Sequence, residues 1–138
     1  MFLCKKGYYS SFEEARRDFI DPTGKYYIER NFYDVEFIIN LIINSGGIPV
    51  LAHPRRLEQK GDELVSYISY LKNIGIVGIE TNYAYNSKEE TTFYKSIAKK
   101  YNLLQTAGSD WHCDSDLDMG ITLSNEQDIV NSLINYKK

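Results

Sequence analysis

The sequence predicts an α/β fold in which three parallel strands alternate with helices. Three short, largely apolar runs, residues 48–52, 76–80 and 103–107, have the length and composition of strands buried in a sheet. Short segments with helical periodicity separate them, and this alternation favours right-handed βαβ units and therefore a parallel sheet. The chain has 138 residues, and an α/β barrel needs about twice that length. The sequence therefore predicts about three parallel strands with flanking helices, as part of a barrel.

The helices around these strands are predicted from their start and stop signals. A pair of serines followed by two glutamates opens an N-terminal helical segment, and an Asp-Pro-Thr-Gly turn ends it. Apolar residues at three- and four-residue steps predict the next two helices. A Ser-x-x-Glu capping box opens the helix after them. The expected helices cover about residues 10–19, 33–44, 64–73, 87–100 and 125–135.

Composition and charge exclude several classes of protein. With 43% hydrophobic and 25% charged residues, the chain is neither disordered nor collagen-like nor a disulfide-stapled miniprotein. A net charge of −3 gives no global field for binding nucleic acid, although a local basic patch is compatible with it. No apolar run approaches the roughly 20 residues of a membrane span, and the N-terminus does not resemble a signal peptide. We expect a cytoplasmic protein that does not enter a membrane.

The residues that could bind a metal or take part in catalysis follow the three predicted strands. His53 comes after the first strand, Glu80 ends the second, and Asp110 and His112 come after the third. In parallel α/β folds the carboxyl ends of the strands meet at one edge, where reactive groups gather. Imidazole and carboxylate are ligands that zinc, manganese and iron accept. We therefore expect His53, Asp110 and His112 to converge within metal-bridging distance; the alternative is that these groups cap strands through hydrogen bonds.

Two arginines and a glutamate extend this candidate site. Arg55 and Arg56 follow His53 directly, and a guanidinium offers a planar fork to phosphate oxygens. The alternative for each arginine is a solvated loop charge. Glu80 is expected to point into the same cleft, or else to be a buried carboxylate paired with a lysine or arginine. A tyrosine at the end of the second strand, Tyr83, could stack on a base or sugar, but the chain has 12 tyrosines and this adds little weight.

Three segments of the chain resemble motifs of the PHP (polymerase and histidinol phosphatase) domain. Residues 46–57, GGIPVLAHPRRL, resemble its GG-x-x-VLAHP-x-R segment, and residues 74–80, IGIVGIE, resemble its G-x-x-GIE strand. Residues 104–112, LQTAGSDWH, resemble its GSD-x-H signature. The order and spacing are those of the family. The branch that looks closest is the bacterial group acting on nucleoside bisphosphates and short RNA 5′ ends, and the similarity runs from about Lys6 to Ile121.

The resemblance implies a (β/α)7, TIM-like barrel that holds up to three divalent metal ions, Mn, Zn or Fe, and hydrolyses phosphate esters. By position in the motifs, His53, Asp110 and His112 would be metal ligands, with Asp110 and His112 acting in catalysis. Arg56 would bind the substrate phosphate, Arg55 occupies the variable position beside it, and Glu80 would lie near the substrate. The implied partners are a phosphorylated small molecule, a nucleotide or a short RNA end.

One part of the family pattern is absent. The family's first motif is an H-x-H followed by further metal ligands, whereas this chain has two histidines in all. We therefore expect the C-terminal fragment of a PHP phosphoesterase, inactive without its N-terminal half. In this interpretation residues 1–32 are a helical insertion remnant, 33–124 a barrel half and 125–138 a terminal helix and tail. The alternatives are a non-catalytic module that binds partners or oligomerises through an open sheet edge, and a complete small α/β protein whose histidines are structural.

Overall fold

The computed structural model describes residues 2–29, 31–112 and 127–136. The chain divides into two compact units, Met1–Tyr33 and Asp34–Lys138, and each is described by itself. The start of the last predicted helix, at residues 125–126, lies outside the described residues. In the described part of the chain, no helix is long and apolar enough to cross a membrane.

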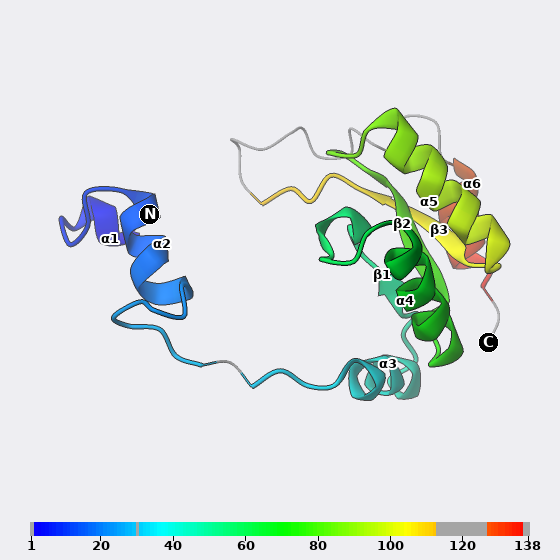
Figure 1. Cartoon of the computed structure of the whole chain (residues 1–138), viewed down its shortest axis with the longest axis horizontal. Coiled ribbons are helices and arrows are strands. Elements are labelled where there is room, and N and C mark those ends of the chain that lie inside the picture. Colours follow the sequence, from blue (N-terminus) through cyan, green and yellow to red (C-terminus); the bar gives the residue numbers. More distant parts are fainter. Residues whose placement is uncertain (1, 30, 113–126, 137–138) are drawn as a thin grey trace. The chain divides into compact units, whose positions relative to one another are not determined.

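The N-terminal unit contains two helices, α1 (Phe2–Lys5) and α2 (Phe12–Ile20) (Figure 1). The predicted cap of α2 is confirmed, because the Ser11 side chain accepts a hydrogen bond from the backbone N–H of Glu14. The sequence did not predict α1, since four residues are too few to establish a helical period.

The second unit is built on a sheet of three parallel strands in the order β1 (Val50–Leu51), β2 (Gly78–Tyr83) and β3 (Leu104–Gly108). The prediction of three parallel strands is confirmed. β1 is shorter than predicted because Pro49 has no N–H to donate; its carbonyl accepts hydrogen bonds from residues 77 and 78 instead. β2 is displaced toward the carboxyl side of its predicted range, because the polar residues beyond Glu80 continue the pairing with β3.

Four helices accompany this sheet: α3 (Val35–Asn44), α4 (Gly61–Asn73), α5 (Lys88–Lys100) and α6 (Gln127–Ile134). α5 contacts β2 and α6 contacts β3 (Figure 1). The predicted capping box of α5 is confirmed, with Ser87 and Glu90 bonding each other's backbone N–H. The core lies where helix faces meet the sheet, and Ile68 of α4, Ile79 of β2 and Ile97 of α5 are all buried in it.

A 3-10 helix, η1 (Pro54–Arg56), follows β1. The backbone N–H of Arg56 donates to the carbonyl of His53, and that of Leu57 donates to the carbonyl of Pro54. Proline in the first turn suits such a helix because its fixed φ is already close to the helical value. This turn brings the two arginines to the carboxyl edge of the sheet.

Candidate functional site

His53 has a backbone conformation that residues other than glycine rarely adopt. Its φ of 31° and ψ of 61° are left-handed, and Asp110 has a φ of 55°. Of the three non-glycine residues with positive φ in the described residues, two are predicted metal ligands. Such conformations cost of the order of 1–3 kcal/mol each and persist where the surroundings hold them, often at functional sites. The backbone is therefore constrained at both strand ends that carry candidate ligands.

Glu80 holds the His53 turn in place. Its Oε2 atom accepts a hydrogen bond from the backbone N–H of His53 at 2.6 Å. The side chain is buried, and burial raises the pKa of Glu80, while the His53 N–H and imidazole act in the opposite direction. The carboxylate accepts from a backbone N–H and not from the lysine or arginine of the alternative interpretation. The substrate role predicted for Glu80 stays a prediction.

Gly108 makes room for this carboxylate. A Cβ atom added to Gly108, at the end of β3, would lie 2.5 Å from Oε1 of Glu80. Glycine is therefore needed here for close approach rather than for an unusual φ angle. The two oxygens of Glu80 thus lie against β3 on one side and against the turn after β1 on the other.

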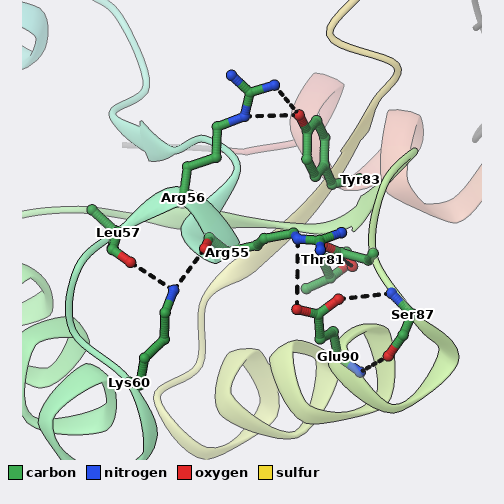
Figure 2. A network of polar contacts seen from close by, with 9 residues as sticks. Arg55, Arg56, Leu57, Lys60, Thr81, Tyr83, Ser87 and Glu90 are labelled. Carbon is green, nitrogen blue, oxygen red and sulfur yellow. Dashed lines mark hydrogen bonds and ion pairs between the residues drawn. The ribbon is translucent and has the colours of Figure 1, made fainter.

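Arg56, Tyr83 and Asp110, here called the Arg56 cluster, join the ends of all three strands. Nε and Nη2 of Arg56 donate to the hydroxyl of Tyr83 at 3.0 and 2.7 Å (Figure 2). That hydroxyl donates to Oδ2 of Asp110 at 3.0 Å, and Nη2 of Arg56 lies 2.9 Å from the same oxygen. Hydrogen bonding to Tyr83 raises the pKa of Arg56, and burial raises the pKa of Tyr83. At neutral pH the guanidinium of Arg56 is therefore charged and the phenol of Tyr83 is neutral.

Asp110 also lies close to His112. Nδ1 of His112 is 2.5 Å from the backbone carbonyl of Asp110, which assigns the proton of a neutral ring to Nδ1. Nε2 then carries the lone pair, 3.8 Å from Oδ1 of Asp110. Two ligands of one tetrahedral zinc ion, each about 2.0–2.2 Å from it, lie about 3.3–3.6 Å apart. Nε2 of His112 and Oδ1 of Asp110 are therefore slightly farther apart than two ligands of one such ion.

The site has ligands of the right kind for a metal but too few of them together. No three His, Cys, Asp or Glu side chains in the described ranges gather closely enough to hold an ion. The expected placement of His53, Asp110 and His112 at one edge of a parallel sheet is confirmed by the strand order. The expected convergence into a three-ligand group is not found among the described residues, where the guanidinium of Arg56 contacts one oxygen of Asp110, and the metal-ligand roles of the three residues stay a prediction.

Arg55 points away from the Arg56 cluster (Figure 2). Its Nε lies 3.7 Å from Oε1 of Glu90, the glutamate of the α5 capping box. Nζ of Lys60 donates to the carbonyls of Arg55 and Leu57 at 2.7 and 2.6 Å. These contacts tie the turn after β1 to the start of α5. They favour a structural role for Arg55, and its substrate role stays a prediction.

Tyr83 is the site residue that sequence reasoning undervalued. It is buried, with 3% of its surface exposed, and its hydroxyl contacts both other members of the Arg56 cluster. The available signal was its position, because it ends β2 at the carboxyl edge. Among 12 tyrosines that signal was weak.

Comparison with known proteins supports the motif-based interpretation. No family model matches the chain. It is 26% identical to a 5′-3′ exoribonuclease of Haemophilus influenzae, over 96% of this chain and 47% of that protein. It is 23% identical to a 3′,5′-nucleoside bisphosphate phosphatase of Chromobacterium violaceum, over 83% of this chain and 40% of that protein. These matches confirm the resemblance to the PHP phosphoesterases.

Solved structures agree with the PHP-like fold. A protein from Bifidobacterium adolescentis, assigned as a metal-dependent phosphoesterase, superposes with a TM-score of 0.70 at 28% identity, over 96% of this chain and 46% of that one. An amidohydrolase from Chromobacterium violaceum superposes with a TM-score of 0.64 at 23% identity, over 82% and 40% of the two chains. The PHP-like chain spans between 38% and 47% of the length of the curated relatives it matches.

Proposed function

We propose that this chain forms the C-terminal part of the active site of a PHP phosphoesterase that hydrolyses phosphate esters of nucleotides or short RNA ends. The carrying observation is the Arg56 cluster, which places a guanidinium beside a candidate ligand at the carboxyl edge of a parallel sheet. Two of the relatives are a 5′-3′ exoribonuclease and a nucleoside bisphosphate phosphatase, and this supports the class of substrate. In the proposal the three strands are part of a (β/α)7 barrel.

Each site residue has a distinct role in this proposal. Arg56 presents two parallel N–H groups to the oxygens of a phosphate and offsets their charge. His112, whose Nδ1 donates to a carbonyl, presents the lone pair of Nε2 and would bind a metal ion through it, and the leaving alkoxide takes its proton from water. Glu80 fixes the His53 turn through its hydrogen bond. Mn, Zn or Fe would supply Lewis-acid chemistry at His53, Asp110 and His112.

Further ligands have to come from outside the described residues. The sequence contains two histidines, and no three-ligand group is found among the residues that the structure describes. The matched relatives are about twice as long as this chain, which supports a contribution from a segment equivalent to their N-terminal half. We therefore propose that the chain by itself turns over phosphate esters poorly.

The test is phosphate release from adenosine 3′,5′-bisphosphate with Mn²⁺ present. The purified chain alone should release little phosphate, and adding the N-terminal half of a full-length relative should increase the rate. His112→Ala should remove that increase, because it deletes a proposed metal ligand. Robust turnover by the chain alone, lost in His112→Ala, would instead mean that the chain holds a complete site.

A second candidate function is a non-catalytic module that associates through apolar surface. The observation that favours it is α3, a mostly apolar helix on which Ile39 is buried while Phe37 and Leu41 are each 51% exposed. A helix that is apolar on most faces is usually covered. Light scattering on the purified protein measures its oligomeric state. A stable oligomer that shows no phosphatase activity in the mixing experiment would favour the non-catalytic module.

A further inference from the structure

The turn that follows β2 presents an exposed aromatic ring at the carboxyl edge of the sheet. Tyr85 lies in this turn, between the end of β2 and the start of α5, and 43% of its surface is exposed. Parallel α/β folds bind their ligands outside the carboxyl ends of the strands, in the loops that follow them. Tyr85 therefore lies where an exposed ring can meet a ligand.

Hydrogen bonds hold the backbone on both sides of Tyr85. The N–H of Ala84 donates to the carbonyl of Gly108 at 3.1 Å, and the N–H of Asn86 donates to the carbonyl of Tyr83 at 2.9 Å. Nδ2 of Asn86 also donates to a carbonyl of β2 at 3.1 Å. A ligand would thus meet a ring whose backbone is already ordered, and such preorganisation lowers the entropic cost of binding.

The Tyr85 ring lies beside the Arg56 cluster. Its centroid is 5.4 Å from that of the Tyr83 ring, and the guanidinium carbon of Arg56 is 5.7 Å from the same Tyr83 centroid. Tyr83 is buried and offers little surface to a ligand, whereas both of its neighbours are exposed. Hydrogen bonding to Tyr83 is the main cause of the raised pKa of Arg56, and Tyr85 adds to it, which agrees with the closeness of ring and guanidinium.

Part of the Arg56 guanidinium remains available to a ligand. Nε and Nη2 donate to the Tyr83 hydroxyl and so orient the group, while Nη1 points away from Tyr83 (Figure 2). The side chain of Arg56 is 58% exposed. A guanidinium binds phosphate oxygens, and a flat aromatic ring stacks on the face of a nucleobase. An exposed cation and an exposed ring, both next to one buried phenol, therefore suit the two ends of a nucleotide.

We propose that Tyr85 is a base-stacking residue, so that Arg56 and Tyr85 together bind a phosphorylated nucleoside, with its phosphate on the guanidinium and its base on the ring. This proposal rests on the proposed function, because that function assigns Arg56 to the phosphate. It gives the site a preference for nucleotides over other phosphate esters, since a stacking ring accepts any base and gains nothing from a ligand without one. A free nucleotide and a phosphorylated RNA end share this chemistry.

The experiment measures how tightly the full 138-residue chain binds adenosine 3′,5′-bisphosphate and ribose 5-phosphate, of which only the first has a base. Binding is followed through the backbone amide NMR signals of residues 82–86. Tyr85→Ala should weaken binding of the bisphosphate about tenfold, a usual effect of losing one stacked base, and should change binding of ribose 5-phosphate less than twofold. Tyr85→Phe keeps the ring, so its affinity for the bisphosphate should stay within twofold of wild type.

A third probe, a 5′-phosphorylated adenosine trinucleotide, distinguishes the two sources of the ligand. Tyr85→Ala should weaken its binding by a similar factor, because its first base has the same position relative to a phosphate. Binding of the trinucleotide more tightly than the bisphosphate identifies an RNA end as the preferred ligand, and the reverse order identifies a free nucleotide.

Tyr70→Ala is the matched control. Tyr70 is 44% exposed, much like Tyr85, but it lies in α4, which leads into the amino end of β2. Its loss should change the affinity for each probe less than twofold. Arg56→Gln should weaken the bisphosphate and ribose 5-phosphate alike, because both contain phosphate. Thermal melting of each variant verifies that it is folded.

Three results would overturn the proposal. Unchanged affinity for the bisphosphate in Tyr85→Ala would mean that the base does not lie on this ring, and equal weakening of both probes would mean that Tyr85 supports the phosphate or the fold. No response of residues 82–86 to the bisphosphate would mean that this turn binds no nucleotide. A failure of the proposed function has a different sign: Arg56→Gln would then leave the affinity for ribose 5-phosphate unchanged, whatever the result at Tyr85.

Discussion

At the scale of single residues, the site depends on pairs in which one side chain fixes another segment's backbone. Glu80 is the clearest case, because a carboxylate from the middle strand accepts the N–H of a residue two positions beyond β1. Its sequence context, at the end of an apolar run, indicated a position at the sheet edge. The identity of its partner was not predictable, since that depends on the left-handed backbone of His53. No short-range pattern encodes that conformation.

A substitution at Gly108 tests this pairing. Gly108→Ala should destabilise the protein by about 1–3 kcal/mol, because the added methyl would collide with a carboxylate that the His53 N–H holds in place. Urea unfolding gives the free energy of each variant. In a Glu80→Ala background the same change should cost clearly less, since the colliding oxygen is gone. Equal costs in the two backgrounds would contradict this explanation of the glycine.

At the scale of elements, the sequence predicted where capped helices begin better than it predicted where strands end. The serine caps of α2 and α5 depend on residues three positions apart, so the sequence contains the whole interaction. The extent of β2 was misjudged because residues beyond Glu80 pair with β3, which lies far away in the sequence, and Thr81 and Tyr83 are buried although they are polar. The convergence of the predicted metal ligands was overestimated for a related reason. Residues that follow strands at the same edge of a sheet need not point their side chains toward one another.

The α5 capping box offers a test of an element and of its link to the site. Ser87→Ala should lower the free energy of unfolding by about 1 kcal/mol, the usual value of such a cap. It should also loosen Arg55, because Glu90 is shared between the cap and the ion pair. Chemical denaturation measures the first effect. Ser96→Ala is the control on the same helix, since the Ser96 hydroxyl donates to the carbonyl of Phe93 in the preceding turn, and it should cost much less.

At the scale of the whole molecule, the core belongs to one of the two units. Every buried apolar side chain of the described residues lies between Ile39 and Ile129, within the second unit. The first unit has none, although its two helices and aromatic contacts, such as the stacked rings of Phe19 and Tyr26, give it local order. The family resemblance assigned residues 1–32 to a helical insertion remnant, and this assignment stays a prediction; the first compact unit ends at Tyr33.

Removal of the first unit should therefore leave the second one folded. A chain of residues 34–138 should keep its far-ultraviolet circular dichroism and a cooperative melt, with a Tm within a few degrees of the full chain, because the buried core is unchanged. The converse piece, residues 1–33, should melt without cooperativity. Loss of cooperative unfolding in residues 34–138 would mean that the first unit contributes to the core.

The shortness of β1 has a consequence for how the sheet edge is closed. Backbone pairing between β1 and β2 covers two residues, Val50 and Leu51, and β2 then continues for four residues without a neighbour on that side. Glu80 takes over at this point, because its side chain reaches the amide of His53 as a backbone carbonyl would. The carboxylate therefore serves as a further rung of the ladder, built from a side chain. Because β1 ends early, the residues that follow it can turn away from β2. The hydrogen bond from the His53 N–H to Glu80 holds this turn against the sheet.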